Sequence, residues 1–479
     1  MLMVIRFNLV SIPFLALLAA CVCLLHSPSS FGQNRDATEQ RNRYDSLQQD
    51  ISNLEETLGQ YDPALIEVLV SLADAADALN LTSESSSLFD RVIQIHRENF
   101  GLFSADQVPF YLTLTGYDAT IGDWTAVNNS LNYLYWLLVE KQVVSGESII
   151  DNLLQLSEFH LWAVASDAVE EQPGHYRKAE ELTVRALKLS ESFWGRFDSR
   201  RFDLYYNLIK QLYLQSSAIE RGGDTNYKLR AVVPGSSWVL KERVVQSNLH
   251  QEGLLLFNEM REIVAAGSDN PTETLAMIDL YRADWHVLFN HDAAEAAYQQ
   301  AFQKLSDAWI EADELDRLFA RPQILPIPVF FDSVGRALSA LESSDFSEQN
   351  VASVGTGNPL SFQDWFGYMS FVPFPTTFPE LSQSLTADYT DIHLSFRMNS
   401  LDRVSRWVNG TRRTGAGVVA EFEVLSEPDT QAIDLVYLNR RLQVLHFRPR
   451  LENGVALPFE GKLFYRAAVP QMPSVRRGR

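Results

Sequence analysis

The chain has 479 residues, enough for two or three domains of ordinary size. Hydrophobic residues make up 46% and charged residues 21%, a globular composition that excludes a polytopic membrane protein or a mostly disordered chain. The formal net charge of −21 repels nucleic-acid phosphates, so we expect no nucleic-acid partner. The two cysteines, Cys21 and Cys23, both fall in the first apolar stretch. No disulfide framework or thiolate metal site is therefore expected in the rest of the chain.

Residues 1–32 have the order of an export signal. Arg6 precedes a long apolar run that ends at Leu25, and small and polar residues follow it. The run is shorter than the about 20 residues that span a bilayer, so we predict cleavage before Gln33 and a periplasmic location. Two alternatives stay open. The Leu-Ala-Ala-Cys sequence that ends at Cys21 fits lipidation of this cysteine, and an uncleaved segment would anchor the chain in the inner membrane.

The chain from 35 to 320 is predicted to be helical and repetitive. Its apolar residues recur every three or four positions, which is the spacing of one helix face. Sliding the sequence by 94 positions aligns two helices with the same apolar face and sets Gly101 on Gly195 as the residue that ends each helix. Small residues such as Ala179 and Ala186 fall where we expect two helices to approach closely.

The segment 175–195 resembles the second helix of a tetratricopeptide repeat (TPR), and residues 291–302 repeat its small positions in Ala294 and Ala301. For residues 35–320 the resemblance implies an α-solenoid of TPR-like helical hairpins whose concave face binds a protein or peptide. The alternative is that the helical region only spaces or supports the last domain.

Composition changes after residue 320. Residues 321–388 are rich in proline and aromatic residues, which predicts a connecting segment without long helices. Aromatic residues alternate with other residues at 360–374, so part of this segment is predicted to be a strand packed on a neighbour. An exposed aromatic patch that binds a partner is the alternative.

Residues 389–470 are predicted to form a small α+β domain, with an antiparallel sheet and one helix, and a basic tail follows at 471–479. The helix is the amphipathic segment 428–442. Apolar and polar residues alternate, as in strands, at 391–398, 417–427, 443–451 and 457–467.

The arginine-rich end of the predicted helix, the following strand and the Asn453-Gly454 turn together resemble the TonB C-terminal domain. The resemblance implies a sheet edge that accepts an extended peptide by main-chain hydrogen bonds, and we expect the last strand, Leu457 to Ala467, to be that edge. The residues predicted on this basis to bind a partner are Arg440, Arg441, Phe447, Arg448, Phe459 and Phe464.

Many arginines crowd the final domain, against the negative sign of the whole chain. Three interpretations stay open. The first is ordinary surface charge paired with acids such as Glu421 and Glu423, and the second is a docking surface for an acidic partner, anionic lipid or glycan. The third is a contact with the acidic helical region.

No catalytic, cofactor-binding or metal-binding residue is predicted, and we do not expect an enzyme. None of the nine histidines has a partner at the spacing of a sequence motif for metal binding. His286 and His291 are five positions apart, which on one helix would put them about 140° apart and make them a poor chelate.

The predicted function is that of a periplasmic adaptor or scaffold that binds other proteins of the cell envelope. The alternative is a membrane-anchored energy transducer, similar to TonB, in TonB-dependent outer-membrane transport. Such transducers carry a long spacer rich in proline and lysine, whereas this chain carries the helical region in that place.

Overall fold

The computed structural model of the chain describes residues 33–168, 171–221, 238–267, 271–327, 329–343, 360–363, 389–401, 404–408, 411–415, 417–425 and 446–468. The predicted signal, the predicted helix 428–442 and the basic tail lie outside these residues. The chain forms two compact units, Met1–Gly101 and Leu102–Arg479. Each unit is described by itself.

The first unit is helical in its described part, with α2 (Gln33–Leu58), α3 (Leu65–Ala78) and α4 (Thr82–Phe100). Apolar residues spaced three or four apart on α3, including Leu65, Leu69 and Leu72, are buried, as the sequence pattern predicts. The Ser85 hydroxyl on α4 donates a hydrogen bond to the carbonyl of Ala73 at 2.9 Å, and it fixes α4 against α3.

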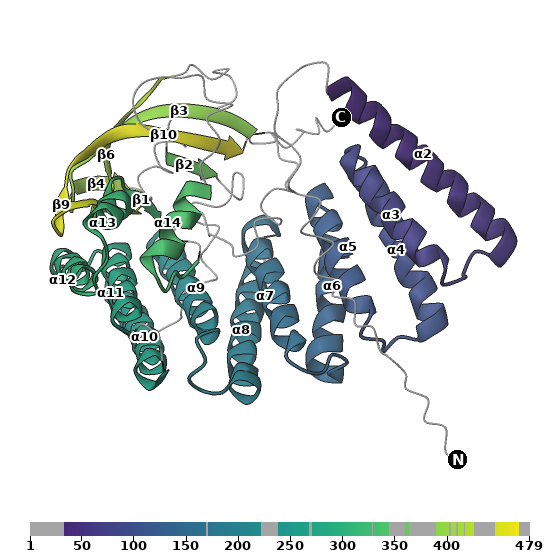
Figure 1. The fold of residues 1–479 in the computed structure, drawn as a ribbon, viewed down its shortest axis with the longest axis horizontal. Helices are drawn as coiled ribbons and strands as arrows, with labels where there is room; N and C mark the ends of the chain where they lie inside the picture. The colour runs from purple at the N-terminus through teal and green to yellow at the C-terminus, as the bar shows by residue number, and fades with distance from the viewer. Residues whose placement is uncertain are drawn as a thin grey trace, which may run out of the picture. The chain divides into compact units, whose positions relative to one another are not determined.

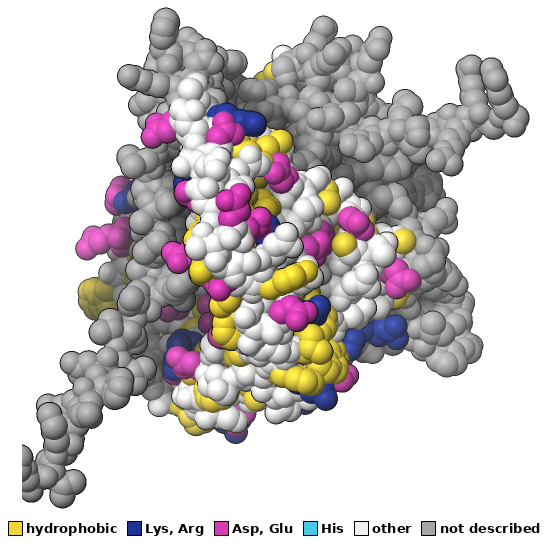
Figure 2. All heavy atoms as spheres, turned by 90° about the vertical axis from the view of Figure 1, so that its right-hand side faces the viewer, with side chains coloured by type: hydrophobic (Ala, Val, Ile, Leu, Met, Phe, Trp, Pro, Cys, Tyr) yellow, Lys and Arg dark blue, Asp and Glu magenta, His cyan; other side chains and the backbone are white. Residues whose placement is uncertain are grey.

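Large hydrophobic side chains remain exposed in this unit, namely Leu58, Tyr61 and Phe100. Figure 2 shows hydrophobic side chains between scattered acidic ones on the face that it views. The turn that carries Tyr61 is fixed locally, because the Asn99 amide donates a 2.7 Å hydrogen bond to the Tyr61 carbonyl. The backbone that carries the exposed Tyr61 ring is therefore held in place.

The second unit is helical over most of its described length (Figure 1). Its closest helix contacts join helices that are neighbours in sequence, so successive helices pack side by side as antiparallel partners. The predicted helices at 175–195 and 291–302 are confirmed. The elements are α5 (Gln107–Ile121), α6 (Trp124–Tyr135), the π-helix η1 (Trp136–Lys141), α7 (Ser148–Ser166), α8 (Gln172–Trp194), α9 (Arg201–Arg221), α10 (Trp238–Gly267), α11 (Pro271–Leu288), α12 (Ala294–Asp307), α13 (Ala312–Phe319) and α14 (Val334–Ser343).

The two glycines aligned by the 94-residue shift both end a helix. Gly101 follows α4 with φ 80° and ψ 172°, and Gly195 follows α8 with φ 90° and ψ 160°. Only glycine adopts this backbone region without strain. The third residues of the two loops, Phe103 and Phe197, are both exposed. The prediction that Gly101 and Gly195 end their helices is therefore confirmed.

The strands lie near the C-terminal end and form small, mostly antiparallel sheets. A four-stranded sheet has the order β2-β10-β3-β6, in which β10 is antiparallel to β3 and parallel to β2. Two-stranded sheets join β1 with β7, β4 with β5 and β8 with β9. The strands are β1 (Gln323–Leu325), β2 (Leu360–Gln363), β3 (Tyr389–Met398), β4 (Val404–Val408), β5 (Thr411–Gly415), β6 (Val419–Val424), β7 (His446–Arg448), β8 (Arg450–Glu452), β9 (Val455–Leu457) and β10 (Phe459–Ala468).

The main hydrophobic core of the second unit joins helices and strands. It runs from α9 to α14 and includes Leu325 of β1 and Leu451 of β8. Its largest fully buried side chains include Trp285, Tyr298 and Phe319. Strands β7, β8 and β9 lie against α11, α13 and α12, respectively. The short C-terminal strands are therefore packed on the end of the helical region.

Within the described part of the chain, no helix combines the length and the apolar character needed to cross a bilayer.

Candidate functional site

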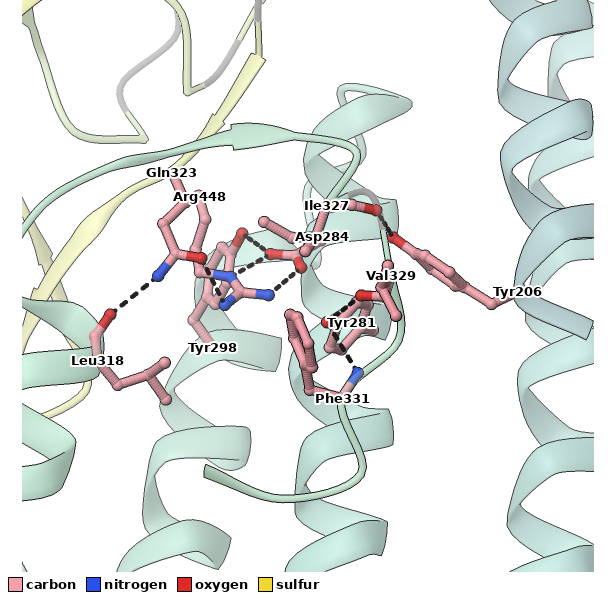
Figure 3. A network of polar contacts seen from close by, with 10 residues as sticks. All are labelled: Tyr206, Tyr281, Asp284, Tyr298, Leu318, Gln323, Ile327, Val329, Phe331 and Arg448. Atoms are coloured by element: carbon pink, nitrogen blue, oxygen red, sulfur yellow. Dashed lines mark hydrogen bonds and ion pairs between the residues drawn. The ribbon is translucent and has the colours of Figure 1, made fainter. Parts of the chain in front are cut away.

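A buried ion pair joins strand β7 to helix α11 (Figure 3). The Arg448 guanidinium donates two hydrogen bonds to the Asp284 carboxylate, from Nε to Oδ1 at 2.9 Å and from Nη2 to Oδ2 at 2.5 Å. The two side chains are 3% and 5% exposed. The Tyr298 hydroxyl on α12 donates to Asp284 Oδ1 at 2.7 Å. One carboxylate thus holds together a strand and two helices.

The network continues to β1, which pairs with β7 and places Gln323 opposite Arg448. Arg448 Nη1 donates to Gln323 Oε1 at 3.3 Å, and Gln323 Nε2 donates to the Leu318 carbonyl at 3.0 Å. The guanidinium also lies 5.4 Å from the centre of the Tyr281 ring. The Arg448 side chain is therefore surrounded by acceptors and an aromatic face.

Two tyrosines fix the segment that follows β1. The Tyr206 hydroxyl donates to the Ile327 carbonyl at 2.7 Å (Figure 3). The Tyr281 hydroxyl donates to the Val329 carbonyl at 2.8 Å and accepts from the Phe331 amide at 3.2 Å. This part of the predicted connecting segment is therefore anchored on α9 and α11.

The charges of the network are stable at ordinary pH. Burial alone would lower the pKa of Arg448, but the adjacent Asp284 carboxylate raises it above its usual value. Burial and the same carboxylate raise the pKa of Tyr298 well above its usual value, so this hydroxyl stays protonated and donates. The network therefore pairs a buried positive charge with a buried negative one and serves as a structural junction between β7, α11 and α12.

The residues predicted to bind a partner are placed differently by the structure. Phe447 is fully buried and packs on Phe396, with 5.7 Å between the ring centres. Arg448 is almost fully buried and pairs with Asp284. These two residues serve the interior and present no surface to a partner. Phe459 is partly buried, with its ring centre 5.8 Å from that of Phe396. Arg440 and Arg441 lie outside the described residues, and Phe464 is described only by its place on β10.

The expectation that the last strand forms a free sheet edge is wrong. β10 pairs with β3 along its whole length, and its residues Leu463 to Arg466 also pair with β2. The main-chain groups that an added strand would need are thus taken on both sides of this segment. The sequence segment at 360–363 forms the strand that covers it.

The arginines of the final domain have different partners. Arg397 pairs with Glu421 across β3 and β6 at 2.7 Å, as expected of ordinary cross-strand surface charge. Arg448 instead reaches the helical region, where it pairs with Asp284. Arg397 therefore fits the interpretation as ordinary surface charge, and Arg448 fits the interpretation as a contact with the helical region.

A groove of about 580 Å³ lies at one end of the helices of the second unit. It is formed by the α8–α9 loop, the end of α10, and the starts of α9, α11 and α14. Its apolar lining includes Phe197, which is 50% exposed, and the buried residues Phe202 and Val264. The lining comprises Phe197, Asp198, Ser199, Phe202, Ile263, Val264, Gly267, Glu273, Thr274, Asp332, Ser333 and Arg336.

The charged residues of the groove are mostly acidic and are held by local contacts. Asp332 pairs with Arg336 at 2.9 Å, and Glu273 accepts a hydrogen bond from the Val334 amide at 2.8 Å. Asp198 pairs with Arg200 at 2.9 Å. Three carboxylates and one guanidinium line the groove, so it favours an occupant that is apolar and basic.

Three histidines meet at the C-terminal end of α11. His250 on α10, His286 on α11 and His291 after α11 have side-chain nitrogens that all lie within 4.8 Å of one another. The expectation that His286 and His291 diverge around one helix is wrong, because α11 ends at Leu288. Asn290 takes φ 52°, and the His291 amide returns to the His286 carbonyl at 2.8 Å. These residues could hold a metal ion.

Burial and the mutual proximity of these rings lower the pKa of His250 and that of His286 to about 4 each. Both imidazoles are therefore neutral near pH 7, which is the form that binds metals.

A second buried polar chain crosses from α7 to α8. The ring nitrogen Nδ1 of His160 lies 2.9 Å from Nδ1 of His175, and His175 Nε2 lies 2.9 Å from Asp167 Oδ2. The Asn128 amide donates to the same carboxylate oxygen at 2.9 Å. His160, His175 and Asp167 are all buried, so these contacts join α7 to α8 away from solvent.

Comparison with protein-family models and with curated proteins gives no match for this chain.

Proposed function

We propose that the protein is an exported adaptor that binds a segment of another protein in the groove of its second unit. The proposal treats the helical region as an array of TPR-like hairpins and the C-terminal strands as a TonB-C-like domain packed on its end. It is supported by the antiparallel neighbour packing of the helices and by the two glycine-ended loops, Gly101 and Gly195, one repeat shift apart.

The observation that carries the proposal is the groove itself. Its volume of about 580 Å³ is that of a site for a few side chains, and it combines an exposed aromatic ring with acidic groups. The exposed Phe197 is placed to be covered by an apolar anchor of the partner. Asp198, Glu273 and Asp332 favour a lysine or arginine beside that anchor. The net charge of −21 favours approach of a basic segment at long range.

The alternative role in energy transduction is less compatible with the geometry. Transducers of that kind carry their C-terminal domain on a long spacer, whereas here Arg448 and Asp284 bind β7 to α11 of the helical region through two buried hydrogen bonds. Breaking this contact exposes a buried charge pair, which is costly. The location in the periplasm remains part of the proposal, and the intact mass of the protein from fractionated cells tests it. A mature chain that starts near Gln33 in the soluble periplasmic fraction supports it, and retention of residues 1–32 in the inner membrane contradicts it.

Binding is tested with a library of displayed random peptides selected on the full chain. We expect enrichment of peptides that combine apolar and basic residues. Phe197→Ala should weaken their binding at least about tenfold, because an aromatic anchor residue contributes about 1.4 kcal/mol or more. Phe103→Ala is the matched control, since Phe103 occupies the equivalent position of the other loop, is similarly exposed at 58% against 50%, and does not line the groove. Equal binding to both variants, or enrichment of acidic peptides, would contradict the proposal.

A further inference from the structure

We propose that His250, His286 and His291 form a binding site for a divalent transition-metal ion that prefers nitrogen ligands, such as zinc. The site is distinct from the groove and does not depend on the adaptor function. Its three ligands come from α10, from the last turn of α11 and from the turn that leads to α12, so a bound ion would fasten three successive elements.

The chain places each ring by a separate local device. The Trp285 indole donates a hydrogen bond to the His250 carbonyl at 2.9 Å, and it fixes α10 against α11 beside the cluster. Gly253, on the next turn of α10, makes this contact possible, because a Cβ there would lie 2.3 Å from the Trp285 ring. His286 follows Trp285 directly and faces His250, with His250 Nε2 and His286 Nδ1 at 3.0 Å.

His291 is brought to the other two by the end of α11. The left-handed residue Asn290, with φ 52°, reverses the chain, and the His291 ring stacks on that of His250 with 4.7 Å between ring centres. The Ala293 amide donates to His291 Nδ1 at 3.2 Å. With Nδ1 accepting, the neutral ring carries its proton on Nε2, so binding an ion through Nε2 requires the ring to leave the Ala293 amide and to carry its proton on Nδ1 instead.

The distances suit a small tetrahedral ion. Zinc–nitrogen bonds of about 2.0–2.1 Å place two ligands of one ion about 3.3 Å apart. The His250–His286 pair is already at 3.0 Å, and the cluster as a whole lies within 4.8 Å. A shift of about 1.5 Å in the His291 nitrogen completes the site; the shift breaks the contact with the Ala293 amide, and the exposed side chain has room for it. Three imidazoles without a thiolate or carboxylate suit zinc, copper(II), nickel or cobalt and disfavour magnesium and calcium.

The test is a calorimetric titration of the full, tag-free chain, stripped of metal, with zinc and separately with magnesium. We expect one zinc ion per chain with micromolar or tighter affinity and no binding of magnesium. His291→Gln should weaken zinc binding at least about tenfold. This ring is exposed, so its loss should leave the fold intact, and circular dichroism checks this. Glu295→Gln, an exposed change on the adjoining helix, should bind as the unchanged protein does and controls for non-specific attraction by negative charge.

Cobalt provides a second readout, which reports the ligand geometry. Four-coordinate cobalt bound by three imidazoles and water should give intense visible absorption, and His286→Gln should abolish it. The proposal is overturned if zinc binds more weakly than about 100 μM, if His291→Gln binds zinc as tightly as the unchanged protein, or if cobalt shows only the weak absorption of a six-coordinate ion.

Discussion

Arg448 and Asp284 are 164 positions apart in the chain, yet their buried side chains meet with Nη2 2.5 Å from Oδ2. Both atoms of the carboxylate are used, and Tyr298 satisfies a further lone pair of Oδ1. A buried pair of this kind adds little net stability relative to apolar residues of the same shape, but it is costly to break from one side. It therefore makes the packing of the C-terminal strands on α11 specific.

Asp284→Asn should strongly destabilise the second unit. The substitution leaves the Arg448 charge buried without a counter-ion, and we expect a loss of about 3–5 kcal/mol in the free energy of unfolding. Urea unfolding followed by circular dichroism measures this loss. Arg196→Ala is the control, because Arg196 and Glu262 form an exposed pair in the same unit, with side chains 56% and 58% exposed. The control should cost less than about 1 kcal/mol. Similar losses in the two variants would show that the buried pair has no special role.

The helices and their ends were largely predictable because their signals are local. The apolar spacing at 175–195 and the glycine at its end lie within one segment, and the structure has α8 from Gln172 to Trp194 followed by Gly195. The strands at 391–398 and 457–467 were equally visible as alternation, and β3 and β10 confirm them.

The candidate sites were not predictable, because they depend on contacts between distant segments. Nothing near Arg448 indicates that its partner is Asp284, so this arginine was assigned to the surface. To predict the pairing of β10 with β2 one must know the order of strands in the sheet, and the alternation of apolar and polar residues does not reveal that order. The histidine cluster was missed for a local reason, since Asn290 was not recognised as the left-handed residue that ends α11. The sequence held one indication of the groove, because the 94-residue shift aligns Phe197 with Phe103, and both side chains are exposed.

The glycine at the end of α8 should tolerate no side chain. Gly195→Ala forces an alanine into φ 90° and ψ 160°, and we expect a loss of about 1–3 kcal/mol. Gly174→Ala in the same helix is the matched control. Gly174 has no positive φ and open space around the position of a Cβ, so its substitution should be neutral or stabilising by up to about 1 kcal/mol. The midpoint of thermal unfolding should fall in Gly195→Ala and stay unchanged or rise in Gly174→Ala. A Gly195→Ala variant as stable as the unchanged protein would refute the role given to this helix end.

The close approach of α10 and α11 should depend on Gly253. A Cβ at this position would lie 2.3 Å from the Trp285 ring, so Gly253→Ala must displace the indole or separate the helices. We expect a loss of about 1–3 kcal/mol, the usual cost of overpacking. Gly267→Ala, at the end of the same helix, meets open space and should cost much less. Urea unfolding followed by circular dichroism measures the loss, and a Gly253→Ala variant as stable as the unchanged protein would contradict it.

The stability of the second unit should fall in mild acid, in part because of His160. Asp167 can only accept hydrogen bonds, so His175 carries its proton on Nε2 and accepts at Nδ1 from the Nδ1–H of His160. This leaves Nε2 of His160 to take up any added proton, and that atom is buried without a hydrogen-bond partner. Burial, with smaller contributions from His175 and Lys178, lowers the pKa of His160 to about 3.

In the unfolded chain the same imidazole has a pKa of about 6.5, so below this pH the unfolded state binds a proton that the folded state rejects. The contribution of His160 is fully present above about pH 6.5 and is lost progressively as the pH falls toward about 3. At pH 5 the loss is about 2 kcal/mol, from about 1.4 kcal/mol per pH unit. Urea unfolding at pH 7.5 and pH 5 measures this difference. His160→Gln cannot titrate, so its stability should fall by about 2 kcal/mol less between the two pH values, even if the variant is less stable at both. An equal fall in the two proteins would show that His160 is not a source of the acid sensitivity.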